Sequence, residues 1–284
     1  ASDVPKLVVP AMHPSMWLDH ATVANVATLR SRGFIVLDPE VGRLTGKDIG
    51  PGRFPETSSI IATFDQITGN IQDLAGTTVL VTAGGTREAI DPVRFIGNKS
   101  SGKQGMAIAK AAHARGAKVI LIAANFPTEN LQGIEVIPVE STREMQGALE
   151  NYFNTCDILI MSAAVSDARP KKTAIEKIKK TFLGSIELEQ NPDLLAEVAA
   201  RKGKRVIVGF AAETKDHLQE ARRKLETKGL DVIYVNDVSG GAIFGQDQTM
   251  GTILLRNEAD IAVKEVSKDA LGNLLLDHAI RQLG

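Results

Sequence analysis

The sequence has few of the features that mark secreted, membrane or nucleic-acid-binding proteins. Its 284 residues include a single cysteine, Cys156, so no disulfide can form within the chain, which favours a reducing compartment. No run approaches the roughly 18 apolar residues that a membrane-spanning helix needs. Basic residues number 33 against 34 acidic ones, a balance that gives no reason to expect nucleic acid or an anionic membrane as a partner. We therefore expect a cytoplasmic protein.

Neither the N-terminal stretch nor the single cysteine indicates a particular function. The first residues, ASDVPKLVVP, lack the basic start and long apolar segment of a signal peptide. They also lack an initiator Met and lead almost directly into a strand-like run, which we interpret as a chain that begins inside a longer one. Cys156 lies beside the apolar run DILIMSAA, so we expect a small buried side chain rather than a nucleophile.

Two familiar nucleotide-binding motifs are incomplete. The stretch FIGNKSSGKQG has the P-loop spacing of Gly97, Gly102 and Lys103, but Gln104 stands where Ser or Thr would bind magnesium. A P-loop also follows its strand directly, whereas a long segment separates Gly97 from the preceding apolar run. The stretch TAGGTRE has adjacent glycines but no third glycine to complete a dinucleotide fingerprint. These departures argue against a Walker site and weaken a dehydrogenase interpretation.

From Thr77 onward, apolar runs alternate regularly with helical patterns. The runs predict strands at 78–84, 117–124, 157–165, 205–214 and 230–237. Helical spacing lies between them, at 101–116, 141–154, 191–203 and 216–229. This pitch predicts an α/β fold, a Rossmann-like doubly wound parallel sheet covered on both faces. The expected extension is an antiparallel pair and a closing helix, at 249–257, 260–266 and 268–283.

Capping residues predict where two helices begin, and composition predicts a domain boundary. Ser141 and Glu144 form a capping box, and Asn191 is expected as an N-cap with Pro192 at the first helical position. Residues 1–68 read as a separate small α/β segment, with a Gly/Pro-rich loop at 42–56. The join near 69–76 is the predicted boundary, which leaves 69–284 as the second domain.

Polar loops follow the predicted strands at the edge where parallel sheets bind ligands. Ser100, Ser101 and Gly102 precede a helix whose free N–H groups and positive dipole end suit a phosphate. An ordinary serine N-cap is the alternative interpretation of these residues. Asp167, in the loop SDARP, is placed to meet a cation.

Two groups of lysines lie near the same edge. Lys177, Lys179 and Lys180 are close together in EKIKK, and Lys224 and Lys228 share one predicted helix face. Separate cationic groups suit a triphosphate, whereas solvated charged faces are the alternative.

Together, the long motifs resemble one family in order and spacing. VLVTAGGTREAIDPVRFIGNKSSGKQG, SAAVSD, EKIKK, NPDLL, GFAAET and VND resemble bacterial phosphopantothenoylcysteine synthetase, the synthetase half of a bifunctional coenzyme A biosynthesis decarboxylase/synthetase. The resemblance covers about residues 75–284. It implies a ligase that joins 4'-phosphopantothenate to L-cysteine with CTP through an acyl-cytidylate. It also implies Mg²⁺ and a homodimer.

The resemblance assigns roles to individual residues. It implies that Asn98 and Lys177 are catalytic and that Asp167 is a candidate metal ligand. The implied nucleotide-binding residues are Ala163, Asp167, Lys177, Asn191, Pro192, Asp193, Leu194, Phe210, Lys224 and Lys228. The implied phosphate- or substrate-binding residues are Gly84, Gly85, Thr86, Ser100, Ser101 and Gly102.

Residues 1–68 resemble the end of the flavin-dependent decarboxylase half. PAMHPSMW matches its motif P-x-M-N-x-x-M-W, except that His13 stands where the catalytic Asn belongs. GRLTGKDIGPGRFPE is similar to its substrate-clamp loop, but Gly46 stands where a reactive cysteine is expected. The resemblance implies a truncated remnant without decarboxylase activity, in which FMN is not expected.

Two other classes of function remain open on the residues alone. One is a nicotinamide- or flavin-dependent oxidoreductase, against which the missing fingerprint and the lysine groups argue. The other is a non-catalytic nucleotide-binding module, against which the presence of Asn98 and Lys177 argues. Thermal protection by CTP with magnesium, and not by NADPH or FMN, distinguishes the ligase from the oxidoreductase.

Overall fold

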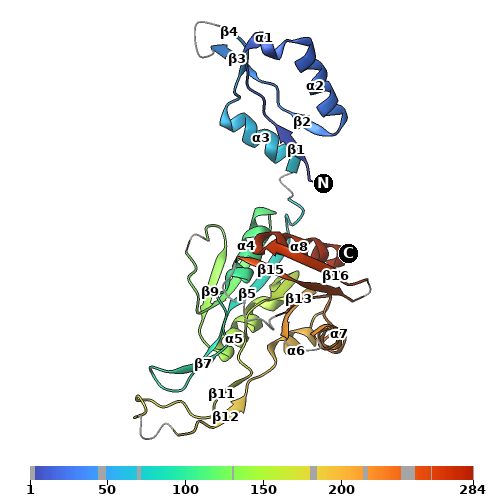
Figure 1. Cartoon of the computed structure of the whole chain (residues 1–284). Coiled ribbons are helices and arrows are strands. Elements are labelled where there is room, and N and C mark those ends of the chain that lie inside the picture. The colour runs from blue at the N-terminus through green and yellow to red at the C-terminus, as the bar shows by residue number, and fades with distance from the viewer. Residues whose placement is uncertain are drawn as a thin grey trace. The chain divides into compact units, whose positions relative to one another are not determined.

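The computed structural model describes residues 4–43, 49–68, 72–129, 131–179, 184–213, 217–237, 247–256 and 258–283 (Figure 1). The chain divides into two compact units, Ala1–Ile71 (unit 1) and Gln72–Gly284 (unit 2). Gly46 and Lys180, both singled out in the sequence, lie outside the described ranges.

Unit 1 is built from short elements. They are β1 (Lys6–Val8), α1 (Pro14–Trp17), α2 (His20–Ser31), β2 (Phe34–Val36), β3 (Glu40–Arg43), β4 (Ile49–Arg53) and α3 (Thr57–Thr68). β1 pairs in parallel with β2, and β3 pairs antiparallel with β4. The prediction of a loop throughout 42–56 is therefore wrong, because backbone pairing with β3 outweighs the turn preference of the glycines and proline there.

Unit 2 contains the predicted alternation of strands and helices. Its strands are β5 (Thr78–Gly84), β6 (Arg87–Ala89), β7 (Phe95–Gly97), β8 (Lys118–Ala124), β9 (Glu135–Val139), β10 (Ile158–Met161), β11 (Ala168–Pro170), β12 (Leu188–Gln190), β13 (Val206–Glu213), β14 (Val232–Asp237), β15 (Gln248–Leu255) and β16 (Ile261–Ser267). Its helices are α4 (Lys103–Ala114), α5 (Thr142–Tyr152), the 3-10 turn η1 (Phe153–Thr155), α6 (Leu194–Ala199), α7 (His217–Thr227) and α8 (Lys268–Leu283).

Among the described residues, eight strands form the main sheet in the order β16-β15-β14-β13-β10-β5-β8-β9. The strands from β14 to β9 pair in parallel, and β15 and β16 add an antiparallel edge. If the parallel strands are numbered along the chain, their spatial order is 3-2-1-4-5-6, the doubly wound Rossmann arrangement. The predicted fold class is thus confirmed. Strand order reverses between β5 and β10, which is where such sheets bind ligands.

Alternate residues of the buried strands pack on opposite faces of this sheet. Val79 and Val81 of β5 lie in a core with Ile108 of α4 and Leu275 of α8. Leu80 lies in the opposite core, which also contains side chains from α5, α6 and α7. Both faces are therefore covered, which explains why the strands read as continuous apolar runs.

One helix start follows its predicted cap, and another does not. Ser141 caps α5: its Oγ accepts a hydrogen bond from the Glu144 N–H at 3.2 Å. The prediction that Asn191 caps the next helix is wrong, because Asp193 is the N-cap of α6 and accepts from the Ala196 N–H at 3.0 Å. The Asn191 side chain instead donates to the Ser166 carbonyl at 2.9 Å.

Two short ribbons extend beyond the main sheet. β6 pairs with β7, and β11 pairs with β12, both antiparallel (Figure 1). They interrupt the simple strand–helix alternation after β5 and β10. No helix in the described part of the chain is long and apolar enough to cross a membrane.

Candidate functional site

The glycine turn after β5 lies at the switch point of the sheet. Gly84 has φ +86°, and a Cβ there would stand 1.9 Å from the Ala124 carbonyl oxygen. Gly85 forms a parallel bridge with Ala164, the loop residue that follows β10. The turn therefore joins the ends of the two strands between which the sheet reverses.

Asn98 connects two of the predicted ligand loops. It follows β7, and its Nδ2 donates to the Val165 carbonyl at 2.9 Å, although the residue itself is exposed. Its backbone oxygen lies so close to Gly85 that a Cβ at Gly85 would be 2.8 Å away. The structure thus brings Asn98 together with the glycine turn and the loop after β10.

The stretch Ser100–Gly102 leads into α4. Gly102 is the N-cap, with φ +70°, and α4 has no side-chain capping hydrogen bond among the described residues. Ser100 Oγ accepts from the Gly102 N–H at 3.4 Å, and Ser101 is exposed. Neither serine is the ordinary N-cap of α4. α4 begins at Lys103, later than the predicted start at 101, and the Lys103 Nζ contacts Asp247 Oδ1 at 2.6 Å.

The loop after β10 contains two predicted nucleotide residues. The Ala163 N–H donates to Thr82 Oγ1 at 3.2 Å, which fixes the start of the loop. Asp167 is exposed, and its backbone oxygen accepts from the Asn191 N–H at 2.9 Å. No group of three or more His, Cys, Asp or Glu that could hold a metal occurs within the described ranges.

A buried polar network locks these loops together. Thr86, predicted to face substrate, is fully buried; its Oγ1 accepts from the Ser166 N–H at 2.8 Å and lies 3.2 Å from Thr142 Oγ1. Asn191 Nδ2 lies 3.3 Å from the same Thr142 oxygen, and Asn191 Oδ1 accepts from Arg169 at 2.8 Å. These side chains position the loops through internal hydrogen bonds.

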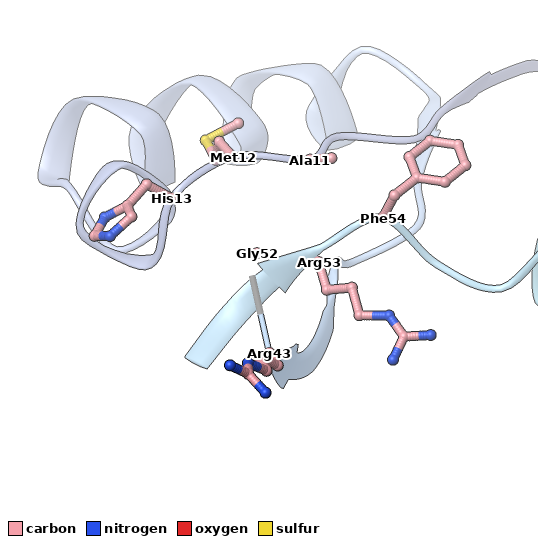
Figure 2. A pocket seen from close by; sticks show the side chains of 7 residues that line it. All are labelled: Ala11, Met12, His13, Arg43, Gly52, Arg53 and Phe54. Carbon is pink, nitrogen blue, oxygen red and sulfur yellow. The ribbon is translucent and has the colours of Figure 1, made fainter. Parts of the chain in front are cut away.

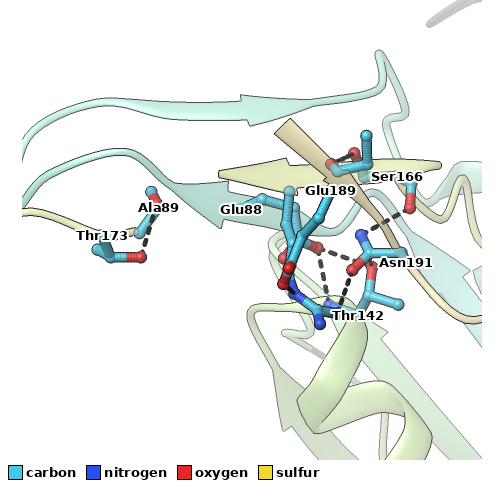
Figure 3. Close-up of polar contacts among 9 residues, drawn as sticks. Glu88, Ala89, Thr142, Ser166, Thr173, Glu189 and Asn191 are labelled. Carbon is cyan, nitrogen blue, oxygen red and sulfur yellow. Dashed lines mark hydrogen bonds and ion pairs between the residues drawn. The ribbon is translucent and has the colours of Figure 1, made fainter. Parts of the chain in front are cut away.

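Sequence reasoning did not identify Glu88, which belongs to this network. Glu88 is buried, and its carboxylate accepts from the N–H of Thr142 at 2.9 Å and from its hydroxyl at 2.7 Å (Figure 3). The carboxylate therefore lies at the N-terminus of α5, where a negative charge is favourable. A glutamate in a short polar stretch offers no periodic signal for burial, so only the tertiary structure reveals it.

Two further predicted nucleotide residues, Phe210 and Lys228, each contact a different partner in unit 2. Phe210 on β13 packs edge-on against Tyr234, with ring centroids 5.7 Å apart. Lys228 Nζ contacts Asp193 Oδ2 at 2.6 Å, which ties α7 to the cap of α6. Partial burial acts to raise the pKa of Asp193, but the ammonium of Lys228 and backbone N–H groups outweigh it and lower the pKa.

Four other predicted residues differ in their exposure. Pro192 and Lys224 are half-buried, Leu194 is buried at the start of α6, and Lys177 is exposed. Lys177 belongs to a stretch without helix or strand.

A separate hollow of about 390 Å³ lies in unit 1 (Figure 2). It is lined by Ala11, Met12, His13, Arg43, Gly52, Arg53 and Phe54. His13 caps α1 by accepting from the Ser15 N–H at 3.3 Å. None of the residues predicted for the nucleotide site lines this hollow.

The fold and the loops define a Rossmann-like α/β enzyme whose glycine turn, Asn98 and the segment leading into α4 meet near the sheet's switch point. Residues 74–283 match the family model described as DNA/pantothenate metabolism flavoprotein C-terminal domain, and residues 1–69 match the model described as Flavoprotein. The chain therefore belongs to the DNA/pantothenate metabolism flavoprotein C-terminal domain family and is an enzyme of coenzyme A biosynthesis.

Curated relatives and solved structures agree with this membership. The coenzyme A biosynthesis bifunctional protein CoaBC of Mycobacterium tuberculosis is 46% identical over 292 residues, covering 96% of this chain and 69% of the relative. The CoaBC protein of Bacillus subtilis is 39% identical, covering 90% and 64%. A crystal structure of the C-terminal domain of CoaBC has a TM-score of 0.65 and 33% identity, covering 75% of this chain and 98% of that one.

The comparisons correct the interpretation of residues 1–68. The prediction that they are a remnant of a decarboxylase half is wrong. Residues 1–69 match the Flavoprotein family model itself. The matches to residues 74–283 and to the C-terminal domain of CoaBC identify the chain as the synthetase part.

Proposed function

We propose that the chain ligates 4'-phosphopantothenate to L-cysteine at the expense of CTP, giving phosphopantothenoylcysteine, CMP and pyrophosphate. The observation that carries the proposal is the junction of Asn98 with the glycine turn and the loop after β10. There the Asn98 amide donates to the Val165 carbonyl at 2.9 Å, beside the N-terminus of α4. An amide next to a phosphate-binding helix end suits an intermediate that contains both an acyl group and a phosphate.

The proposed reaction has two displacement steps. A carboxylate oxygen of 4'-phosphopantothenate attacks the α-phosphorus of CTP, and the bond from that phosphorus to the bridging oxygen breaks to release pyrophosphate. The amine of cysteine then attacks the acyl carbon of the acyl-cytidylate. An amide bond forms, the acyl carbon–oxygen bond breaks, CMP leaves, and the amine nitrogen loses a proton.

The residues of the site have distinct roles in this proposal. Asn98 donates to the acyl-cytidylate and holds it for the amine, and Lys177 neutralises charge on the phosphates as pyrophosphate leaves. Gly84 and Gly85 have no side chain to block the approach of a phosphate, and the Ser100–Gly102 turn leads into the N-terminus of α4, whose positive dipole end favours phosphate oxygens. Phe210 lies against the nucleotide, and the Asn191–Leu194 turn, Lys224 and Lys228 complete its site.

Magnesium fits the residues at this edge. Mg²⁺ is commonly bound by one or two carboxylates together with phosphate oxygens and waters, and exposed Asp167 supplies one carboxylate. Bound there, the ion would supply positive charge to the triphosphate. The lysines of the two cationic groups would balance the remaining charge.

The oxidoreductase alternative makes a different prediction for ligand binding. CTP with magnesium should raise the thermal midpoint of the chain, while NADPH and FMN should leave it unchanged. ATP in place of CTP tests the nucleotide preference, which no residue type in the site dictates. Protection by NADPH or FMN without protection by CTP would favour the oxidoreductase.

We also propose that the chain is a homodimer. The ribbons that extend from unit 2 expose large apolar side chains: Val93 and Phe95 near β7, and Ile175 and Leu188 near the β11–β12 ribbon. Large apolar side chains left exposed on these ribbons favour contact with a second copy. Light scattering after size-exclusion chromatography should give twice the chain mass, and Phe95→Ser should shift the protein toward the monomer. A monomeric wild type would contradict this proposal.

The decisive assay follows both products of the proposed reaction. With CTP and 4'-phosphopantothenate, the wild type should release pyrophosphate, and CMP should form only after cysteine is added. Asn98→Asp should release pyrophosphate but stall at the acyl-cytidylate, because a carboxylate cannot donate as the amide does. Asn151→Asp is the matched control, since Asn151 is exposed near the C-terminal end of α5. Absence of pyrophosphate release with every nucleotide would reject the ligase function.

A further inference from the structure

The segment that carries Lys177 has no secondary structure to hold it. Residues 171–179 form neither helix nor strand and are mostly exposed. Two hydrogen bonds connect the first half of the segment to the end of β6 and the residue after it: Thr173 Oγ1 donates to the Ala89 carbonyl at 3.1 Å (Figure 3), and the Ala174 N–H donates to the Ile90 carbonyl at 2.9 Å. These two hydrogen bonds lie three or four residues before Lys177, so the position of Lys177 also depends on contacts at its neighbour Ile178.

Those contacts come from one ion pair, between buried Asp91 and half-buried Arg94. Asp91 is 2% exposed, and its Oδ2 accepts from the Ile178 N–H at 3.2 Å. Arg94 contacts Asp91 Oδ2 at 2.7 Å and donates through Nη2 to the Ile178 carbonyl at 2.5 Å. Both polar backbone groups of Ile178 are thus bound by the same Asp–Arg pair. We call these contacts the Asp91 clamp.

The two carboxylate oxygens of Asp91 bind different partners. Oδ1 accepts from the N–H groups of Val93 and Arg94, at 2.9 and 2.8 Å, and so shapes the turn between β6 and β7. Oδ2 faces outward to Ile178 and the Arg94 guanidinium. Burial acts to raise the pKa of Asp91, but the N–H groups of Val93, Ile178 and Arg94 and the Arg94 side chain outweigh it and lower the pKa to about 2. The carboxylate is therefore ionised at neutral pH.

We propose that Asp91 is a positioning residue for Lys177, acting through the backbone of Ile178. The role in turnover rests on the proposed function, because that function makes Lys177 a catalytic group. Since Ile178 is adjacent to Lys177, fixing its peptide limits how far the lysine backbone can move. Small displacements of catalytic groups cost large factors in rate, so a clamp one residue away matters to the reaction.

Limited proteolysis tests the clamp without reference to activity. Asp91→Asn retains one oxygen for the turn but presents an amide to Ile178 and Arg94, so it removes the outer contacts selectively. Trypsin cleavage after Lys177, followed by mass spectrometry, should accelerate by roughly tenfold or more. Asp231→Asn is the matched control: Asp231 is also a buried carboxylate that accepts a backbone N–H, from Ile207 at 2.8 Å, and it pairs with Lys202 at the opposite end of the sheet. Equal cleavage in the two variants and the wild type would overturn the clamp.

A double-mutant cycle tests whether Asp91 acts through Lys177. Asp91→Asn should lower kcat for pyrophosphate release by roughly tenfold or more, with a smaller change in KM for CTP. In a Lys177→Ala background the same change should have little further effect, because the group it positions is gone. Multiplicative losses in the double variant would show a general structural defect and overturn the positioning role.

The two proposals fail in distinguishable ways. If the wild type releases no pyrophosphate, the ligase function fails and the catalytic role of Asp91 falls with it, while proteolysis still decides the clamp. If the wild type is active and Asp91→Asn changes neither cleavage nor kcat, only the clamp fails. Should Asp91→Asn not fold, Asp91→Ser replaces it, because serine can support the local turn but cannot reach Ile178.

Discussion

Substituting Gly85 with alanine tests whether the turn after β5 fixes the reacting geometry. An added Cβ would lie 2.8 Å from the backbone oxygen of Asn98 and 3.4 Å from Ser100 Cβ. Gly85 does not have a left-handed φ, so the change strains the contact and not its own backbone. A carbon and an oxygen cannot remain this close, so the backbone at Gly85 or at Asn98 must shift; reaching ordinary contact at 3.4 Å from 2.8 Å takes about 0.6 Å. Either shift displaces the Asn98 amide relative to the glycine turn.

We expect Gly85→Ala to affect the reaction far more than the fold. Misplacement of a reacting group on this scale lowers kcat by about tenfold to a hundredfold. Overpacking against an exposed loop should cost about 1 kcal/mol, the low end of the range for core sites. In a domain of this size that cost lowers the thermal midpoint by about 2–4 °C. Asn98 acts on the acyl-cytidylate in our proposal, so CMP formation should suffer more than pyrophosphate release.

Alanine substitutions at two other glycines serve as comparison variants for the effects on kcat and on stability. Gly147 lies inside α5 with nothing within 4 Å of an added Cβ, so Gly147→Ala should stabilise the protein by about 0.5–1 kcal/mol without changing kcat. Gly84→Ala should instead prevent normal folding, because of its φ of +86° and the 1.9 Å clash with Ala124. If Gly85→Ala kept wild-type CMP formation, or melted as early as Gly84→Ala, the proposed separation of rate and stability would be wrong.

Three further predictions concern charge. Burial raises the pKa of the Cys156 thiol to about 12, so iodoacetamide at pH 8 should modify it only after unfolding, as intact mass would show. The pKa of Asp91 is lowered from 3.8 to about 2, so its ionised form stabilises the fold above pH 4, and this contribution is lost as pH falls toward 2. The difference in thermal midpoint between the wild type and Asp91→Asn should therefore become smaller between about pH 4 and pH 2. A constant difference over that range would contradict the prediction. Lys228→Met should raise KM for CTP by about tenfold with little change in kcat; an unchanged KM would assign Lys228 only to its ion pair with Asp193.

The parallel sheet could be predicted from the sequence because each buried strand carries its own apolar run. The edge strand β9 could not, since its residues range from exposed to buried without regular alternation. The ribbons β6–β7 and β11–β12 are three residues per strand, too short for periodicity, and β11 pairs with a strand far along the chain. Local patterns record burial within one element and do not specify distant pairing.

The stretch NPDLL shows why the cap of α6 was misplaced. Asn191 and Asp193 are both good N-cap residues, and a proline at the first helical position favoured Asn191. Tertiary contacts exclude Asn191 as the cap, because its side-chain amide donates to the Ser166 carbonyl and accepts from Arg169. Similarly, the sequence did not single out the carboxylates of Glu88 and Asp91, because N–H groups distant in the chain help to make their burial favourable.

Different contacts hold Asn98 and Lys177 in place. The two proposed steps should therefore respond to different substitutions. The loops near Asn98 are held by a buried network centred on Thr86 and Thr142, which fixes them before any ligand binds. Lys177 lies on a segment without helix or strand, next to the peptide that the Asp91 clamp holds. Release of pyrophosphate should therefore be the step most sensitive to Asp91, whereas transfer to cysteine should be most sensitive to Gly85 and Asn98. A variant of either support that slowed both steps equally would mean that the two parts move as one unit.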